Sequence, residues 1–237
     1  MCHKKALIVA IDGPSGVGKS TISRGVAQRL GFTYLDTGAM YRAVAFHLQS
    51  HGVDPADSEA VALELENIAI DLQPAGTDGD VGVVLNGVAI GHLIRTPEIS
   101  MLASRVSALA PVRAKLTMMQ QRIGRNGRIV AEGRDTGSVV FPNAAFKFYL
   151  DATPEARASR RALQLRERGE DVDEKALLEM TRTRDKNDSE RALAPLKKAD
   201  DAVLVDTTGI SAGQVLEKLL AHISIPPAGL KSCKGDG

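Results

Sequence analysis

An apolar run followed by a glycine-rich loop constrains this chain of 237 residues more than any other feature. Residues 6–11 (ALIVAI) are continuously apolar, which predicts a buried strand of a parallel sheet. Residues 13–20 (GPSGVGKS) match G-x-x-x-x-G-K-[ST] in full, and residues 19–30 have the pattern of a helix that ends at Gly31. A strand, such a loop and a helix, in this order, form a phosphate-binding P-loop.

The P-loop predicts a site for a nucleoside triphosphate. Its glycines let backbone N–H groups point at phosphate oxygens, and the helix N-terminus adds partial positive charge. We expect Lys19 to reach the β- and γ-phosphates and the Ser20 hydroxyl to coordinate Mg²⁺. The expected donor site comprises Gly13, Pro14, Ser15, Gly16, Val17, Gly18, Lys19, Ser20 and Thr21. The alternative is a strand-to-helix turn that binds nothing, and the motif does not specify the acceptor.

Beyond the loop, short apolar strands alternate with helices, which predicts an α/β fold with helices on both faces of a parallel sheet. With residues 6–11, the expected strands 33–35, 128–131, 146–150 and 202–205 give about five strands. Helices are expected at 19–30, 38–50, 57–67, 97–109, 111–123, 154–168 and 173–188, and after a cap at Ser211. Residues 68–72, 81–85 and 88–90 predict locally paired strands, with Asn86-Gly87 as a type I′ turn.

Charge is unevenly distributed along the chain. Residues 43–94 contain eight acidic residues and no Lys or Arg, so they carry −8 while the remainder carries +9. This segment is either a solvated acidic surface or a small α+β insert kept away from anionic ligands.

Composition excludes several classes of protein. The net charge of +1, the absence of Trp and 3% aromatic residues argue against a nucleic-acid partner. No stretch approaches the ~20 apolar residues of a membrane span. Two cysteines, Cys2 and Cys233, argue against a disulfide scaffold and fit a reducing compartment, so we expect a cytoplasmic protein. His47 and His51 are spaced i, i+4, but the sequence shows no third ligand, so a zinc site is not expected.

Polar residues follow two of the expected strands. Asp36, Thr37 and Arg42 follow the second strand, and residues 132–135 (EGRD) follow strand 128–131. Strand carboxyl ends of an open α/β sheet line its ligand crevice. The alternatives are an Asx-type cap at Asp36 and a plain surface ion pair within EGRD.

Two later helices carry arginines on one face. Arg157, Arg160 and Arg161 are either a solvated face or part of a lid that closes over phosphates. Arg184, Asp188 and Arg191 form either a salt-bridged stripe or phosphate clamps around a carboxylate for a sugar hydroxyl. Behind an intact P-loop, this dispersed positive charge favours phosphoryl transfer between two anions.

Six stretches in order resemble the bacterial cytidylate kinases, which are adenylate-kinase-like nucleoside monophosphate kinases. They are IDGPSGVGKST, LDTGAMYRA, IRTPEISMLASRVSALAPVR, AEGRDTGSVVFP, KFYLDATPEARASRR and RDKNDSERALAPL, and AVLVDTT fits the last strand. The resemblance implies ATP-dependent phosphorylation of CMP and dCMP with Mg²⁺. It also implies core segments 1–42, 97–153 and 171–224, a monophosphate-binding insert 43–96 and a lid 154–170. Residues 225–237, which contain Pro226-Pro227 and scattered Gly and Lys, predict a loose tail.

The resemblance also implies residue roles. Asp36 and Thr37 support the acceptor, and its phosphate is held by Arg42, Arg134 and Arg191. The cytosine is read by Ser104, Arg113 and Asp135. Arg184 and Asp188 serve the phosphate and ribose region, and the catalytic set is Lys19 with the lid arginines Arg157 and Arg161. Independently of the resemblance, we expect Ser20, and Glu132 through water, to hold the metal. Many members have Gly-Thr where this chain has Ser20-Thr21, and Thr37 stands where Ser is also common; both departures keep a hydroxyl.

Two rivals remain at this point. One is a P-loop kinase for another small acceptor, such as UMP, shikimate or dephospho-coenzyme A. The other is a nucleotide-sensing protein that binds without turnover. We expect a monomer that acts on small molecules.

Overall fold

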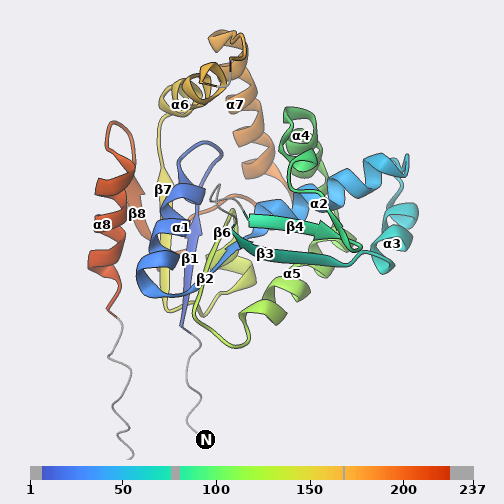
Figure 1. The fold of residues 1–237 in the computed structure, drawn as a ribbon, viewed down its shortest axis with the longest axis horizontal. Coiled ribbons are helices and arrows are strands. Elements are labelled where there is room, and N and C mark those ends of the chain that lie inside the picture. Colours follow the sequence, from blue (N-terminus) through green and yellow to red (C-terminus); the bar gives the residue numbers. More distant parts are fainter. Residues whose placement is uncertain (1–6, 76–80, 168, 225–237) are drawn as a thin grey trace, which may run out of the picture.

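The computed structural model describes residues 7–75, 81–167 and 169–224. The predicted tail 225–237, Cys2 and Cys233 lie outside these residues. Five strands form a parallel sheet in the order β2-β6-β1-β7-β8 (Figure 1). They are β1 (Ile8–Asp12), β2 (Thr33–Asp36), β6 (Ile129–Gly133), β7 (Phe146–Asp151) and β8 (Val203–Asp206). The predicted five-stranded parallel sheet is confirmed, and β1 and β6 are buried along their whole length, as continuous apolar strands require.

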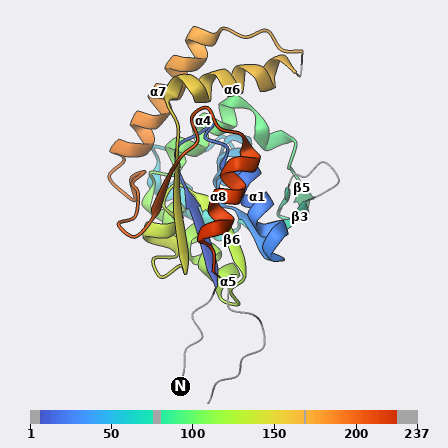
Figure 2. The same cartoon turned by 90° about the vertical axis from the view of Figure 1, so that its left-hand side faces the viewer.

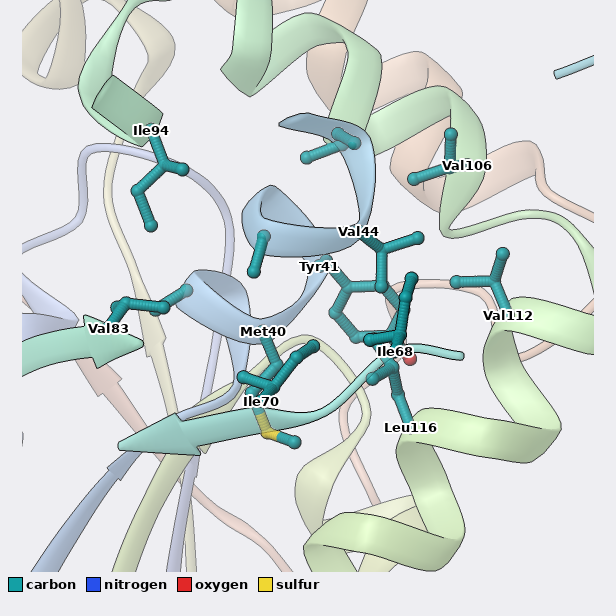
Figure 3. Packing of buried hydrophobic residues seen from close by; sticks show 14 of the residues in the cluster. Met40, Tyr41, Val44, Ile68, Ile70, Val83, Ile94, Val106, Val112 and Leu116 are labelled. Carbon is teal, nitrogen blue, oxygen red and sulfur yellow. The ribbon is translucent and has the colours of Figure 1, made fainter. Parts of the chain in front are cut away.

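Helices cover both faces of this sheet. On one face, α1 (Lys19–Leu30) packs beside α8 (Ala212–His222), which begins with a capping box at Ser211 (Figure 2). On the other face lie α2 (Thr37–Ser50), α4 (Pro97–Val106) and α5 (Ala110–Gly124). Their apolar side chains form one core, in which Met40 and Val44 of α2 lie beside Leu116 of α5 (Figure 3).

A second, antiparallel sheet lies within residues 43–96. It pairs β3 (Ile70–Ala75), β4 (Val81–Leu85) and β5 (Val88–Ala89) in that order. Asn86 and Gly87 have φ values of 49° and 82°, so the predicted turn with two positive φ angles is confirmed. Helix α3 (Ser58–Glu66) is capped by Asp57, as predicted, and a 3₁₀ turn spans Leu93–Arg95. Figure 3 shows Ile70 and Val83 of this sheet pointing towards α2.

Two long helices, α6 (Pro154–Arg166) and α7 (Glu174–Glu190), pack together beyond the carboxyl end of the sheet (Figures 1 and 2). Asp173 caps α7, and Thr153 caps α6. No helix within the described ranges is both long and apolar enough to cross a membrane.

A π-helix at Thr136–Val140 is absent from the sequence-based prediction. Asp12, at the end of β1, holds its first turn: the carboxylate accepts hydrogen bonds from Thr136 N at 2.8 Å, Thr136 Oγ1 at 2.7 Å and Gly137 N at 2.7 Å. Because the partner of this turn is far away in the sequence, no local pattern reveals it. The contact fixes the chain just after Asp135, a predicted base-reading residue.

Gly13 is where the backbone comes closest to a neighbouring strand. A Cβ on Gly13 would lie 2.1 Å from the carbonyl oxygen of Leu150 in β7, and φ of Gly13 is +150°. We expect Gly13→Ala to destabilise the protein by about 1–3 kcal/mol or more, because the loop must move away from β7. The measurement is urea unfolding.

Gly31→Ala is the matched control: Gly31 also has a positive φ, of +64°, but no described atom lies within 4 Å of its added Cβ. It should cost about 1 kcal/mol. Equal costs in the two variants would contradict the close-approach argument.

Candidate active site

The P-loop connects β1 to the first turn of α1, as predicted. Gly13, Gly16 and Gly18 all have positive φ angles, so the loop turns through conformations that other residues rarely adopt. No side chain of the described residues caps the N-terminus of α1 at Gly18, which leaves its first N–H groups for a ligand. The Lys19 side chain curls back over the loop and donates to Pro14 O at 2.6 Å.

Ser20 and Glu132 meet between the P-loop and β6. Ser20 Oγ donates to Glu132 Oε1 at 2.7 Å, and the Tyr34 hydroxyl donates to the same oxygen at 2.5 Å. Glu132 is buried, and its Oε2 has no hydrogen-bond partner among the described residues. Burial, and then the nearby Asp36 carboxylate, raise the pKa of Glu132. A hydroxyl beside a buried carboxylate oxygen fits a hydrated Mg²⁺ ion, which prefers oxygen ligands and keeps several waters.

Tyr34 is a site residue that the sequence prediction missed. Its hydroxyl holds the Glu132 carboxylate, and burial raises its pKa far above the ordinary value, so it remains a donor. The only available signal was its place on a strand next to β6. A tyrosine on such a strand is usually part of the core, so the pattern alone could not assign it.

Four cations gather at the carboxyl edge of the sheet: Lys19, Arg42, Arg134 and Arg184. Burial, and then repulsion from Arg134 and Arg42, lower the pKa of Arg184 to about 10. Burial, and then Arg134 and Arg184, also hold the pKa of Lys19 well below its ordinary range. Arg42 Nε and Arg184 Nε have no hydrogen-bond partner within the described part of the chain. Burial alone would lower the pKa of Arg134, but its pairing with Asp188 reverses this effect and the net pKa is raised. The repulsion therefore acts on Lys19 and Arg184, and an anion bound among these groups would offset it.

Asp36 and Thr37 hold the start of α2 against β6. Asp36 caps α2 by accepting from Ala39 N at 2.8 Å, and it also pairs with Arg42 Nη2 at 3.1 Å. Thr37 Oγ1 donates to the backbone oxygen of Glu132 at 2.6 Å. The capping interpretation of Asp36 is therefore correct, and Arg42 is placed beside it.

Asp188 on α7 joins two predicted acceptor residues. It accepts from Arg134 Nε at 2.8 Å and from Ser104 Oγ at 2.9 Å. Burial alone would raise the pKa of Asp188, but Arg134 reverses this effect and the net pKa is lowered. Ser104 thus contacts Asp188, whereas the resemblance grouped it with Arg113 and Asp135.

Asp135 lies between two buried guanidinium groups. Arg113 Nη2 donates to Asp135 Oδ2, and Arg191 Nη2 lies 3.6 Å from Asp135 Oδ1. Arg191 Nη1 also donates to Ser107 Oγ at 3.1 Å. Arg191 therefore lies with the predicted base-reading residues, next to the buried hydroxyl of Tyr41, which has no hydrogen-bond partner among the described residues.

The two predicted lid arginines differ in their surroundings. Arg157 is 3% exposed, and its guanidinium donates to Ser15 O at 3.1 Å and to Asp185 at 2.9 and 2.5 Å. It connects the P-loop to both α6 and α7. Arg161 is half-buried on α6, and Arg160 donates to Thr207, which directly follows β8. Asp185, which the sequence prediction left without a role, is the partner of Arg157.

Comparisons with known proteins identify the family of this chain. The family model for cytidylate kinase matches residues 9–225. The cytidylate kinase of Syntrophotalea carbinolica is 47% identical over 93% of each chain, and that of Pseudomonas aeruginosa is 46% identical over 91% of this chain and 94% of the relative. A bifunctional pantoate ligase/cytidylate kinase of Synechococcus sp. is 51% identical over 90% of this chain, which spans only 43% of that relative's length.

A solved structure of an uncharacterized protein from Eubacterium ventriosum supports the fold. It covers 92% of this chain and 98% of its own, with 11% identity and a TM-score of 0.50. The match to the family model covers residues 9–225, which include the P-loop, Arg42, Arg134, Asp135 and Arg184. The chain therefore belongs to the cytidylate kinase family.

Proposed function

We propose that this chain transfers the γ-phosphoryl group of ATP to CMP and dCMP, giving ADP with CDP or dCDP. The observation that carries the proposal is the group of cations at the carboxyl edge of the sheet, where Arg134 and Arg184 help to lower the pKa of buried Lys19 and Arg134 helps to lower the pKa of Arg184. Such a site fits the two phosphate groups that meet during phosphoryl transfer. Family membership supports a pyrimidine monophosphate as the acceptor.

On the donor side, the P-loop N–H groups bind the ATP phosphates and Lys19 moves from Pro14 O to the transferring group. Ser20 and, through water, Glu132 hold Mg²⁺, which supplies charge neutralisation on the phosphates when it is bound. Arg157 keeps the loop in position through Ser15 O.

On the acceptor side, Arg42, Arg134 and Arg184 hold the monophosphate. Asp188, fixed by Ser104 and Arg134, is placed for the ribose. Asp135, fixed by Arg113 and Arg191, accepts from the N4 amino group of cytosine. In uracil an O4 acceptor replaces this donor, and the carboxylate repels it.

The segmental division into core, insert and lid is part of the same proposal. The second sheet supports an insert within residues 43–96, and the position of α6 and α7 beyond the strand ends supports a lid that excludes water during transfer. In this proposal the arginines of α6 are the lid residues that face the donor phosphates, and Arg157 already donates to Ser15 O of the P-loop.

The test is ADP release from Mg·ATP with CMP, dCMP, UMP, AMP and shikimate as acceptors. We expect turnover with CMP and dCMP and much slower reaction with the others. Preference for shikimate or UMP would favour another P-loop kinase activity. Binding of CMP with no turnover on any acceptor would favour the nucleotide-sensing alternative.

A further inference from the structure

Two histidines and a glutamate meet at the junction of α2 and α3. His47 and His51 are one helical turn apart at the C-terminal end of α2, and Glu64 is on the facing side of α3. One potential ligand atom from each lies within 4.8 Å of those of the other two. His47 Nε2 is 2.7 Å from Glu64 Oε2, and the two imidazole rings are 4.1 Å apart between centroids. The third ligand that the sequence pattern did not show is thus provided by a separate helix.

The hydrogen bonding of His51 supports a role as a ligand. Its Nδ1 lies 2.9 Å from the backbone oxygen of His47, which leaves Nε2 for an ion. Metal-binding histidines commonly donate their other ring nitrogen to a backbone carbonyl in this way, because the bond fixes the ring and its tautomer. The same contact places both rings on one side of α2.

We propose that His47, His51 and Glu64 form a binding site for Zn²⁺ or a similar first-row transition-metal ion. Two imidazoles and one carboxylate are a ligand set that such ions prefer and that Mg²⁺ does not. His47 is 4% exposed and provides a fixed ligand, whereas His51 is exposed and Glu64 is half-buried. The exposed side admits the ion and supplies water as a fourth ligand.

The ion would stabilise the insert rather than take part in phosphoryl transfer. Thr37 and His47 are ten residues apart on one helix, which places the ion about 15 Å along α2 from the start of the acceptor site. Binding would join the end of α2 to α3, beyond the hydrogen bond that already connects His47 to Glu64. The inference is independent of which acceptor the enzyme uses.

The test is a Zn²⁺ titration of the full chain by calorimetry, after removal of bound metal and in the presence of Mg²⁺. Cys2→Ser and Cys233→Ser form the background, since thiolates also bind zinc. We expect one ion per chain and a higher Tm with Zn²⁺. His51→Ala and Glu64→Gln should each weaken Zn²⁺ binding about tenfold or more. Mutating even a residue that only hydrogen-bonds to a metal ligand lowers metal affinity by this factor, and these two residues are proposed as ligands themselves.

His92→Ala is the matched control, because His92 is an exposed histidine in the same insert but outside the cluster. It should bind Zn²⁺ as the parent does. Circular dichroism and kinase activity of His51→Ala should stay unchanged, which separates loss of the ion from loss of the fold. Absence of saturable binding, or equal binding by the parent and His51→Ala, would overturn the proposal. Equal weakening in His92→Ala would overturn it too, because binding would then not be specific to the cluster.

Discussion

Replacing Lys19 with Met should reduce kcat about 10²–10³-fold or more while the protein remains folded. Lys19 is the P-loop cation, and its pKa is lowered by burial and by Arg134 and Arg184. A buried cation directed at a transferring phosphoryl group stabilises charge that develops in the transition state, and loss of one such group has an effect of this size. Removing it also relieves repulsion among the arginines, so the stability of the free protein should fall little.

Steady-state ADP release at saturating CMP and ATP measures the effect. Lys175→Met is the matched control, because Lys175 is an exposed lysine at the start of α7. It should leave kcat unchanged. A Lys19→Met enzyme with kcat within a few-fold of the parent would remove Lys19 from the proposed role.

The second large effect concerns Asp135→Asn and the choice between CMP and UMP. Asp135 is 5% exposed, and its carboxylate is held by Arg113 and Arg191. An Asn at this position can turn either its oxygen or its amino group towards the base, so it no longer repels the O4 oxygen of uracil. We expect the ratio of kcat/KM for CMP over UMP to fall about 5- to 150-fold, which corresponds to about 1–3 kcal/mol.

The variant should also lose stability, because Asp135→Asn leaves two buried guanidinium groups without their carboxylate. Breaking a buried ion pair from one side costs about 3–5 kcal/mol. The loss of folded enzyme lowers kcat/KM for CMP and for UMP by the same factor, so it does not affect their ratio within one variant. Asp201→Asn serves as a control, because it removes the carboxylate partner of another buried cation, Lys147. Lys147 lies near the start of β7, away from the carboxyl ends of the strands that form the site. Its CMP-to-UMP ratio should not change, and an unchanged ratio in Asp135→Asn would exclude Asp135 as the base-reading residue.

Most of the fold follows from local patterns. The strand, loop and helix around Lys19, the caps at Asp57 and Ser211, and the Asn86-Gly87 turn are each encoded within a few neighbouring residues. Continuous apolar strands indicated a sheet buried on both faces. These signals are short-range, and the structure confirms each of them.

The details of the site depend on contacts between distant segments. Asp12 received no role from the sequence, yet it holds the π-helix at Thr136–Val140. Ser104 binds Asp188, and Arg157 binds Asp185, across different helices. The sequence predicts which residue types line the site, because arginines and carboxylates follow the strands. It does not predict which carboxylate each cation meets, since the packing of α6 and α7 decides that pairing.

The most direct test is a crystal structure with CMP and a non-hydrolysable ATP analogue bound together. The account predicts the triphosphate within the N–H groups of the P-loop and the CMP phosphate between Arg42, Arg134 and Arg184. The cytosine amino group should donate to Asp135. A pyrimidine monophosphate bound elsewhere, or with its phosphate directed away from Lys19, would contradict the account.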